Sequence, residues 1–215
     1  MMDNAIARPH LLLRWRNWAQ NLGRFLAQHH VTANDISLLG VMFAATAGAA
    51  FYFSPQPGAF DRALLLLLAA AAIQLRKLSG HLHAIVTRES VQPPPHAIFY
   101  DFPSRIADVL MLVPVGYAVH KLPYGVELAW SAALLGLFNA YVRSMGNQAT
   151  EQKSRLITRN FPMTLLSAAC ILSLFDTLVY RSGVMLWIAL IVLNVAALVT
   201  IWQRTLQIVH AEEKH

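Results

Sequence analysis

Cysteine and charge are both scarce in this sequence. Its 215 residues include a single cysteine, Cys170, which excludes an internal disulfide and a cysteine-rich metal site. Charged residues are 13% of the chain, about half the share of an ordinary soluble domain. That is too little charge to coat a soluble globule of this size, which argues against a soluble enzyme, a disordered tail and a small secreted module. With 56% hydrophobic residues, the composition indicates an integral membrane protein.

Recognisable catalytic motifs are missing as well. The sequence contains no Walker loop, no G-x-G-x-x-G, no H-E-x-x-H and no Ser/His/Asp arrangement. Its net charge of +6 would suit a nucleic acid, but membrane proteins collect Lys and Arg on their cytoplasmic side, so we expect no nucleic-acid partner. The opening stretch MMDNAIARPH also lacks the apolar core and cleavage site of a signal peptide.

An amphipathic segment covers residues 8–30. Apolar residues at helical spacing share one narrow face of it, namely Leu11, Trp15, Trp18, Leu22, Phe25 and Leu26. Polar residues occupy the other face, namely Arg16, Gln20, Arg24 and Gln28. This pattern is typical of a helix that lies in the membrane interface. We therefore assign residues 1–33 to an interfacial helix and its cap, with Thr32, Asn34 and Asp35 as suitable N-caps of the next helix.

Six apolar segments follow in residues 34–203, and residues 204–215 form a polar tail. The segments run over residues 36–54, from 63 to about Arg88, from Phe102 or Ser104 to Val119, and over 124–142, 161–180 and 184–202. The second extends to Arg88 because residues 63–75 alone would cover only about 20 Å of a hydrocarbon core of about 30 Å. Three consecutive prolines make residues 89–97 a loop. The expected fold class is all-α, with six transmembrane helices plus the N-terminal interfacial amphipathic helix.

The distribution of basic residues predicts the orientation of these spans. With a cytoplasmic N-terminus and six spans, 14 of the 17 Lys and Arg residues lie on the cytoplasmic side. The remaining three are Arg62, Lys121 and Arg181. Because Lys and Arg are enriched on the cytoplasmic side of membrane proteins, this split predicts that both termini are cytoplasmic.

Polar residues within membrane depth are costly and are therefore candidates for function. One group surrounds the inner end of the second span and the start of the third, and comprises Arg76, Lys77, Ser79, His81, His83, Thr87, Arg88, His96, Asp101, Arg105 and Asp108. A second lies between the fourth and fifth spans and comprises Arg143, Lys153, Arg155 and Arg159. Four basic groups at a membrane face bind phosphate or anionic lipid readily, although topology alone would also place them there.

Two further patterns occur in the first group. Asp101, Arg105 and Asp108 share one helical face, which predicts an ion-pair ladder with the arginine in the middle. His81 and His83, with His96 and an aspartate, are the alternative of a transition-metal site. The two nearer histidines lie about 200° apart on a helix, so they converge only if the helix unwinds. His83, Asp101 and Asp108 are the weak metal candidates.

The chain resembles the CDP-alcohol phosphatidyltransferase family in two places. The segment HHVTANDISLLGVM is similar to the opening of the family domain, and Gly80 to Asp108 is similar to its signature region. The resemblance implies six spans, an interfacial N-terminal helix and a homodimer. In the family, the signature D-x-x-D-G-x-x-A-R, eight residues, then G-x-x-x-D-x-x-x-D supplies four carboxylates that hold two divalent metals. The last Asp acts as the base, and CMP leaves from a CDP-linked lipid.

The signature carboxylates are mostly replaced in this chain. The first half of the pattern falls on Gly80, His83, Ala84, Thr87 and Arg88. The second half falls on Ala97, Asp101 and Arg105, or, one residue earlier, on His96, Tyr100 and Ser104. One carboxylate remains in the first register and none in the second. Hard cations such as Mg²⁺ need oxygen ligands, and nearby Arg88 and Arg105 would repel metals, so the resemblance implies the family fold without its two-metal chemistry.

The expected function is therefore a non-catalytic member of this family. It would bind an anionic phospholipid, a CDP-linked lipid or a nucleotide phosphate through Arg88, Arg105, Lys153, Arg155 and Arg159, in a bacterial cytoplasmic membrane. A lipid-synthesis enzyme is a possible partner. One alternative is an active transferase that uses Mg or Mn to make a phospholipid from CDP-diacylglycerol and an alcohol. The other is a small transporter or channel subunit.

Overall fold

Six long helices make up most of the described part of the chain. The computed structural model describes residues 18, 21–23, 25, 28, 31–55, 58–89, 98–145, 161–179 and 183–212. The helices are α2 (Ala33–Phe53), α3 (Ala59–Glu89), α4 (Ile98–Ala118), α5 (Gly125–Met145), α6 (Phe161–Val179) and α7 (Val184–Glu212). No strand occurs among these residues, which confirms the all-α class. The amphipathic segment 8–30 falls mostly outside the described residues.

The helix ends follow from local sequence signals. Thr32 is the N-cap of α2, in a capping box in which its hydroxyl accepts from the Asp35 backbone N–H at 3.2 Å. The Asp35 carboxylate in turn accepts from the Thr32 backbone N–H at 3.0 Å. The helix α3 is 31 residues long and passes through Arg88, as predicted. At 1.5 Å per residue it measures about 46 Å, longer than a bilayer core.

Most of the helices extend beyond the predicted bounds, and α4 and α7 are two examples. The helix α4 begins at Ile98, ahead of Phe102, and includes Pro103. The helix α7 continues to Glu212, so residues 204–212 are helical where the sequence indicated a polar tail. No proline or glycine occurs between Trp202 and Glu212 to stop the helix.

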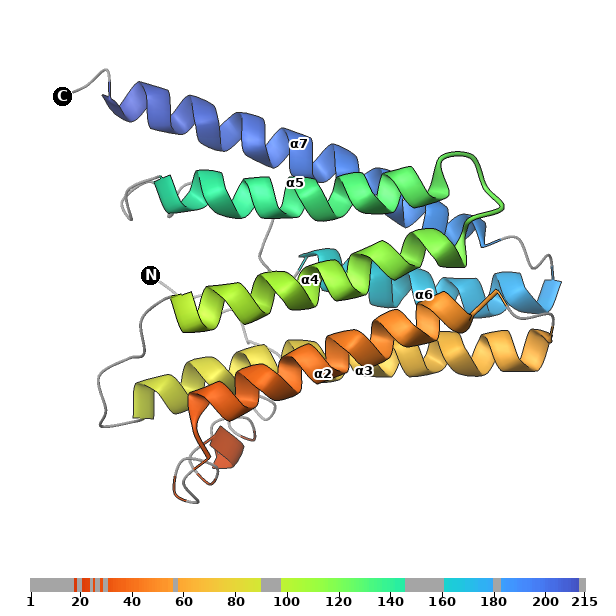
Figure 1. Ribbon diagram of the computed structural model, residues 1–215, viewed down its shortest axis with the longest axis horizontal. Helices are drawn as coiled ribbons and strands as arrows, with labels where there is room; N and C mark the ends of the chain where they lie inside the picture. The colour runs from red at the N-terminus through yellow and green to blue at the C-terminus, as the bar shows by residue number, and fades with distance from the viewer. Residues whose placement is uncertain are drawn as a thin grey trace, which may run out of the picture.

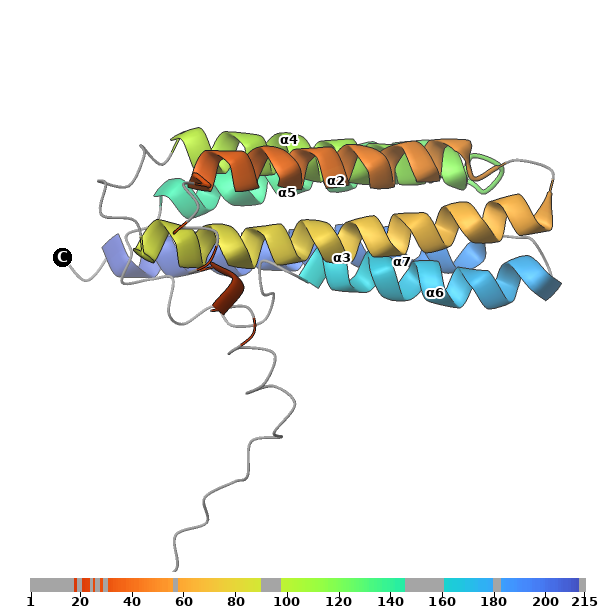
Figure 2. The same ribbon diagram turned by 90° about the horizontal axis from the view of Figure 1, so that it is seen from below.

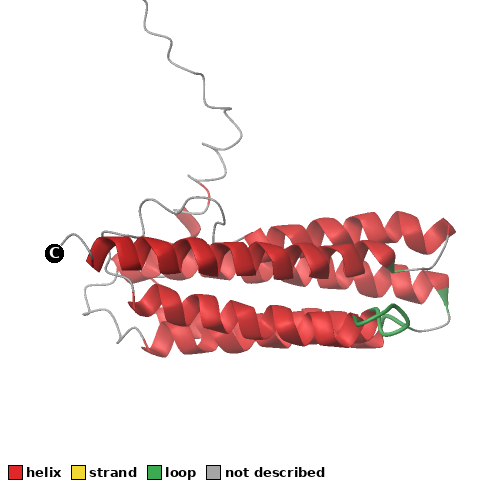
Figure 3. Cartoon of the chain, turned by 90° about the horizontal axis from the view of Figure 1, so that it is seen from above, coloured by secondary structure: helices red, strands yellow, loops and turns green. Residues whose placement is uncertain are grey.

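The six helices pack as a closed ring. Each has two principal neighbours, in the order α2, α3, α6, α7, α5, α4 and back to α2. All lie along the long axis of the molecule (Figure 1), with α2, α4 and α5 in one layer and α3, α6 and α7 in the other (Figure 2). The view from the opposite side shows the same elongated bundle of helices (Figure 3). One hydrophobic cluster draws buried side chains from all six helices.

One end of the bundle is rich in arginine, and we call it the basic end. There α3, α5 and α7 finish and α2 and α4 begin (Figure 1), with Arg143 in the last turn of α5. The helix α6 is different, because it begins partway along the bundle (Figures 1 and 2). The first turn of α6 therefore lies between the two ends of the bundle, among the other helices.

The outer surface of the bundle is apolar. Phe60 is 80% exposed, and Phe175 and Trp202 are each 67% exposed. Four stretches, Ala33–Phe53, Phe60–Thr87, Gly125–Ser144 and Val184–Val209, are long and apolar enough to cross a membrane. The apolar stretch of α6 is shorter, and α4, which carries Arg105 and Asp108, is not among the four. By length and composition, the described residues thus form an all-α membrane protein with four candidate spans.

Candidate functional site

A small cavity lies where α2, α3 and α4 meet near the basic end. Its lining comprises Ile36, Ser37, Arg76, Ser79, Gly80, His83 and Ser104. The cavity measures about 10 Å³, and a single water needs about 10–15 Å³, so side chains nearly fill it. It brings together Gly80, His83 and Ser104, three positions that the sequence resemblance assigns to signature carboxylates.

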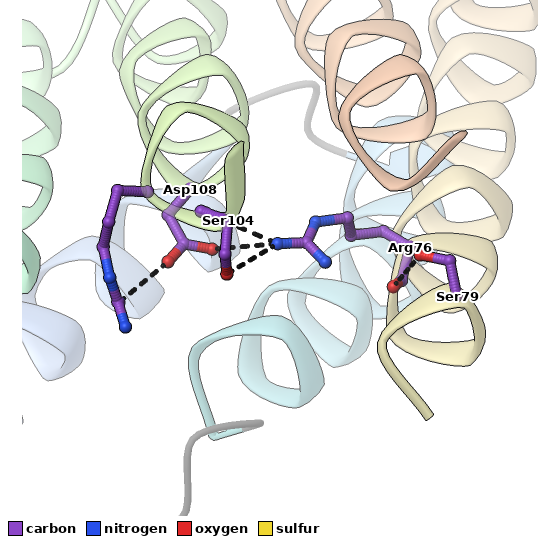
Figure 4. Close-up of polar contacts among 5 residues, drawn as sticks. Arg76, Ser79, Ser104 and Asp108 are labelled. Carbon is purple, nitrogen blue, oxygen red and sulfur yellow. Dashed lines mark hydrogen bonds and ion pairs between the residues drawn. The ribbon is translucent and has the colours of Figure 1, made fainter. Parts of the chain in front are cut away.

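The side chain of Arg76 occupies much of this junction. It extends from α3 to α4, where Nη2 donates to Ser104 Oγ at 3.1 Å and to the Ser104 carbonyl oxygen at 3.4 Å (Figure 4). The same nitrogen lies 3.8 Å from Asp108 Oδ1. Arg76 is only 7% exposed, so a permanent positive charge is buried between two helices.

The carboxylate of Asp108 lies between two arginines. One oxygen faces Arg76, and the other accepts from Arg105 Nη1 at 3.3 Å. The predicted pairing of Arg105 with Asp108 is therefore confirmed, while the side chain of Asp101 lies outside the described residues. The contribution of Arg76 could not be seen from helical spacing, because it comes from another helix.

The side chain of His83 links α3 to the start of α2 through hydrogen bonds. Its Nδ1 lies 2.9 Å from the Ala33 carbonyl oxygen and 3.0 Å from Ser37 Oγ. A carbonyl oxygen only accepts, so Nδ1 carries the hydrogen in this contact. The imidazole is 7% exposed and is held in the packing between the two helices.

The residues at this junction do not fit a pair of divalent cations. The described lining of the small cavity has no carboxylate, and it includes the guanidinium of Arg76. Mg²⁺ and Mn²⁺ prefer oxygen ligands of negative charge, and a fixed arginine repels them. Across the described residues, no three His, Cys, Asp or Glu side chains form a metal-binding group.

A larger cavity opens between α4, α5, α6 and α7, and we call it the arginine cavity. It measures about 130 Å³, room for roughly ten water-sized groups. Its polar lining comprises Ser104, Arg105, Asp108, Asn139, Arg143, Thr200 and Arg204. Three separate helices thus each contribute one arginine to a single space.

The electrostatics of the arginine cavity favour an anion. Among the described lining residues, Arg105, Arg143 and Arg204 carry positive charge and Asp108 carries negative charge. Phe161 and Met163 from the first turn of α6 also line it, so the positive end of that helix dipole adds to the field. Guanidinium groups bind phosphate oxygens through paired, charge-assisted hydrogen bonds. The arrangement suits a phosphate group of about two negative charges.

The predicted binding residues are only partly placed by the structure. Arg105 lines the arginine cavity, and Arg143 from the second basic group joins it. Lys153, Arg155 and Arg159 lie outside the described residues, as do His96 and Ala97, and nothing is described of the side chains of Arg88, Tyr100 and Asp101. Of the other signature positions, Thr87 Oγ1 donates to the His83 carbonyl oxygen at 2.8 Å, and Ala84 is exposed.

Sequence reasoning missed three members of the arginine cavity. In the sequence, Arg204 contributes only to the predicted topology, and Asn139 and Thr200 lie within predicted apolar spans. Their position in the sequence could have identified them as site residues. Each is a polar residue in an otherwise apolar helix, near the end of that helix where basic residues gather. No family model matches the chain, and no curated protein is significantly similar to it.

Proposed function

We propose that this chain is a non-catalytic membrane protein of the CDP-alcohol phosphatidyltransferase type that binds a phosphate group in the arginine cavity. The phosphate belongs to an anionic lipid or to a nucleotide. All six helices cross the membrane, with the basic end in the cytoplasm. The proposal rests on one observation. A single cavity is lined by three arginines from three helices, namely Arg105 of α4, Arg143 of α5 and Arg204 of α7.

The membrane arrangement rests on packing and charge. The helices α4 and α6 lie within the same ring as the four longer apolar helices, so they lie at the same depth (Figure 2). Arg143 and Arg204 lie toward the basic end, whereas Lys121 lies in the turn between α4 and α5 at the opposite end. A cytoplasmic basic end agrees with the enrichment of Lys and Arg on that side.

The non-catalytic assignment rests on the small cavity. Gly80, His83 and Ser104 line it together, which supports the register that ends on Ser104 and keeps no signature carboxylate. Neither Ser104 nor its neighbour Arg105 is a base of the strength that an alcohol proton requires near neutral pH. Arg76 supplies a fixed positive charge at the place where the family resemblance implies metals.

The first prediction concerns Arg143→Gln in the arginine cavity. Loss of one charge-assisted contact, about 1.5–3 kcal/mol, should weaken phosphate binding about tenfold or more. The measurement is the affinity of the detergent-purified chain for glycerol 3-phosphate and for phosphatidic acid, by thermal-shift titration. Lys121→Gln is the matched control, because it removes the same charge from an exposed site at the other end. It should bind both probes as the wild type does.

Two results would contradict the proposal. Equal affinities for the wild type and Arg143→Gln would mean that topology alone placed the arginines. Release of CMP from CDP-diacylglycerol and an alcohol by the purified wild type, with any divalent ion, would show that the chain is a transferase.

A further inference from the structure

The arginine cavity changes from polar to apolar along its length. On α4, the polar residues Ser104, Arg105 and Asp108 precede Val109, Met111 and Leu112. On α7, Thr200 and Arg204 lie toward the basic end, and the apolar members are Leu193, Ala196 and Ala197. On α5, Asn139 and Arg143 likewise lie nearer the basic end than Ala132, Ala133, Gly136 and Leu137. All three helices therefore place their polar groups at the same end of the cavity.

Small residues on α5 keep the inner part of the cavity open. Ala132, Ala133, Gly136 and Ala140 all line it, and apart from the helix's own nearby backbone and the residues adjacent to Gly136, no described atom lies within 4 Å of the place where a Cβ on Gly136 would stand. A glycine within a helix weakens it by about 1 kcal/mol relative to alanine, so local helix stability does not account for Gly136. The space beside it is instead part of a cavity whose apolar walls have room for a narrow occupant.

We propose that the occupant is a lipid with a phosphate headgroup, bound with its phosphate among the three arginines and the first methylenes of one chain beside Gly136. The inference rests on the proposed function, because it identifies the molecule that carries the phosphate. The charge of the arginine end complements a phosphate, and the apolar end complements a hydrocarbon chain. From residue 132 to residue 143, α5 follows the cavity for about 16 Å, longer than a phosphate alone requires.

A soluble phosphate or a nucleotide fits the inner part poorly. In its described lining, Met111, Leu112, Ala133 and Leu193 offer no side-chain hydrogen-bond donor or acceptor of ordinary strength. A ribose or a base placed there would lose its hydrogen bonds to water without replacement. Water in that part would also lack the polar partners that hold buried water in place. A methylene chain makes no hydrogen bonds to water, so it loses none on entering this part of the cavity, and it gains apolar contacts.

The test compares Gly136→Leu with the wild type, using probes that differ only in their chain. Glycerol 3-phosphate supplies the headgroup alone, and lysophosphatidic acid adds one acyl chain. Each methylene that is buried contributes about fourfold in affinity, so the wild type should bind the lipid at least about tenfold more tightly than glycerol 3-phosphate. Gly136→Leu should lose this preference and keep its affinity for glycerol 3-phosphate. Ala168→Leu places a leucine at an exposed position of α6, away from the cavity, and should behave as the wild type.

The outcomes separate this inference from the proposed function. If Gly136→Leu keeps the preference while Arg143→Gln loses both ligands, the chain does not enter the cavity, and the phosphate site stands. If Arg143→Gln binds both probes normally, the phosphate site itself is wrong. If the wild type binds cytidine monophosphate more tightly than lysophosphatidic acid, the occupant is a nucleotide and the lipid assignment is wrong.

A second measurement does not depend on any variant being folded. Lysophosphatidic acid with a photoreactive diazirine near the start of its chain is cross-linked to the wild-type protein, and the labelled residues are mapped by mass spectrometry. Labels should fall on the cavity-lining residues of α5 and α7, such as Ala133 and Ala197. Labels confined to outward residues such as Leu134 and Phe138, which are 60% and 52% exposed, would overturn the inference.

Discussion

At the scale of single residues, Arg76 and Asp108 determine the character of the site. Arg76 is 7% exposed and donates to both oxygens of Ser104, while Asp108 receives Arg105 on its other side. A charge removed from water is tolerated only when it is paired and hydrogen-bonded. The Asp108 carboxylate therefore partly neutralises two arginines, Arg76 in the small cavity and Arg105 in the arginine cavity.

Asp108→Asn should affect stability and binding in opposite directions. The amide cannot neutralise Arg76, so the free energy of unfolding should fall by about 2 kcal/mol. Loss of the carboxylate that competes for Arg105 should also strengthen the binding of glycerol 3-phosphate severalfold. Chemical unfolding in detergent and a binding titration measure the two effects.

The control for this prediction is a double variant, Arg76→Met with Asp108→Asn. Removing both charged partners leaves no unpaired charge at the buried Arg76 position, so most of the lost stability should return. A single variant that matches the wild type in both stability and affinity would show that Asp108 does not balance these arginines.

At the scale of helices, close approach and interhelical hydrogen bonds hold the ring together. Gly48 of α2 lies against the Leu110 carbonyl of α4, where an added Cβ would collide with backbone. Between the neighbouring helices α3 and α6, Gln74 donates to Ser167 at 2.8 Å. Asn194 of α7 donates to the Leu128 carbonyl of α5 at 2.9 Å. In lipid, where apolar surfaces gain little from meeting each other, such contacts are the main source of helix association.

Gly48→Leu should separate α2 from α4. The neighbouring atom is backbone and cannot move aside, so we expect a loss of about 1–3 kcal/mol from overpacking. Ala49→Leu is the matched control, because the adjacent position is exposed on the same helix and has room for the side chain. Thermal unfolding in nanodiscs gives the comparison, and an equal loss in both variants would contradict the close contact.

At the scale of the whole molecule, the ring places α4 and α6 beside the four candidate spans. The helix α4 is not among the four candidate spans and carries Arg105 and Asp108, yet it packs against both α2 and α5. Of the polar side chains of α4, those of Ser104, Arg105 and Asp108 line the two cavities. A helix whose charges face inward can cross a bilayer even when its average hydropathy is low.

Labelling of single cysteines tests this arrangement. In a Cys170→Ala background, Asp61→Cys at the start of α3 and Lys121→Cys after α4 should react with a membrane-impermeant maleimide from the same side. Gln203→Cys, on α7 toward the basic end, should react only from the other side. If the first two positions react from opposite sides, α3 and α4 do not both cross, and the six-span arrangement is wrong.

The sequence alone determined the class of this protein and most of its helices. Scarce charge and long apolar segments predicted an all-α membrane protein, and Thr32 marked the start of α2, whereas the loop predicted from three prolines lies outside the described residues. These features depend on local chemistry and on the composition of each segment, so no tertiary contact was needed to find them. The Arg105–Asp108 pair belongs with them, because its spacing is set by one helix.

Only the tertiary structure decided which polar residues share a site. Arg105, Arg143 and Arg204 come from three helices that are far apart in the chain, and spacing along one helix cannot show that they line one cavity. The same is true of Arg76, which reaches Ser104 and Asp108 only because α3 and α4 lie across from each other beside α2. Periodicity determines the face of a helix on which a residue lies, whereas the packing of the ring determines what that face meets.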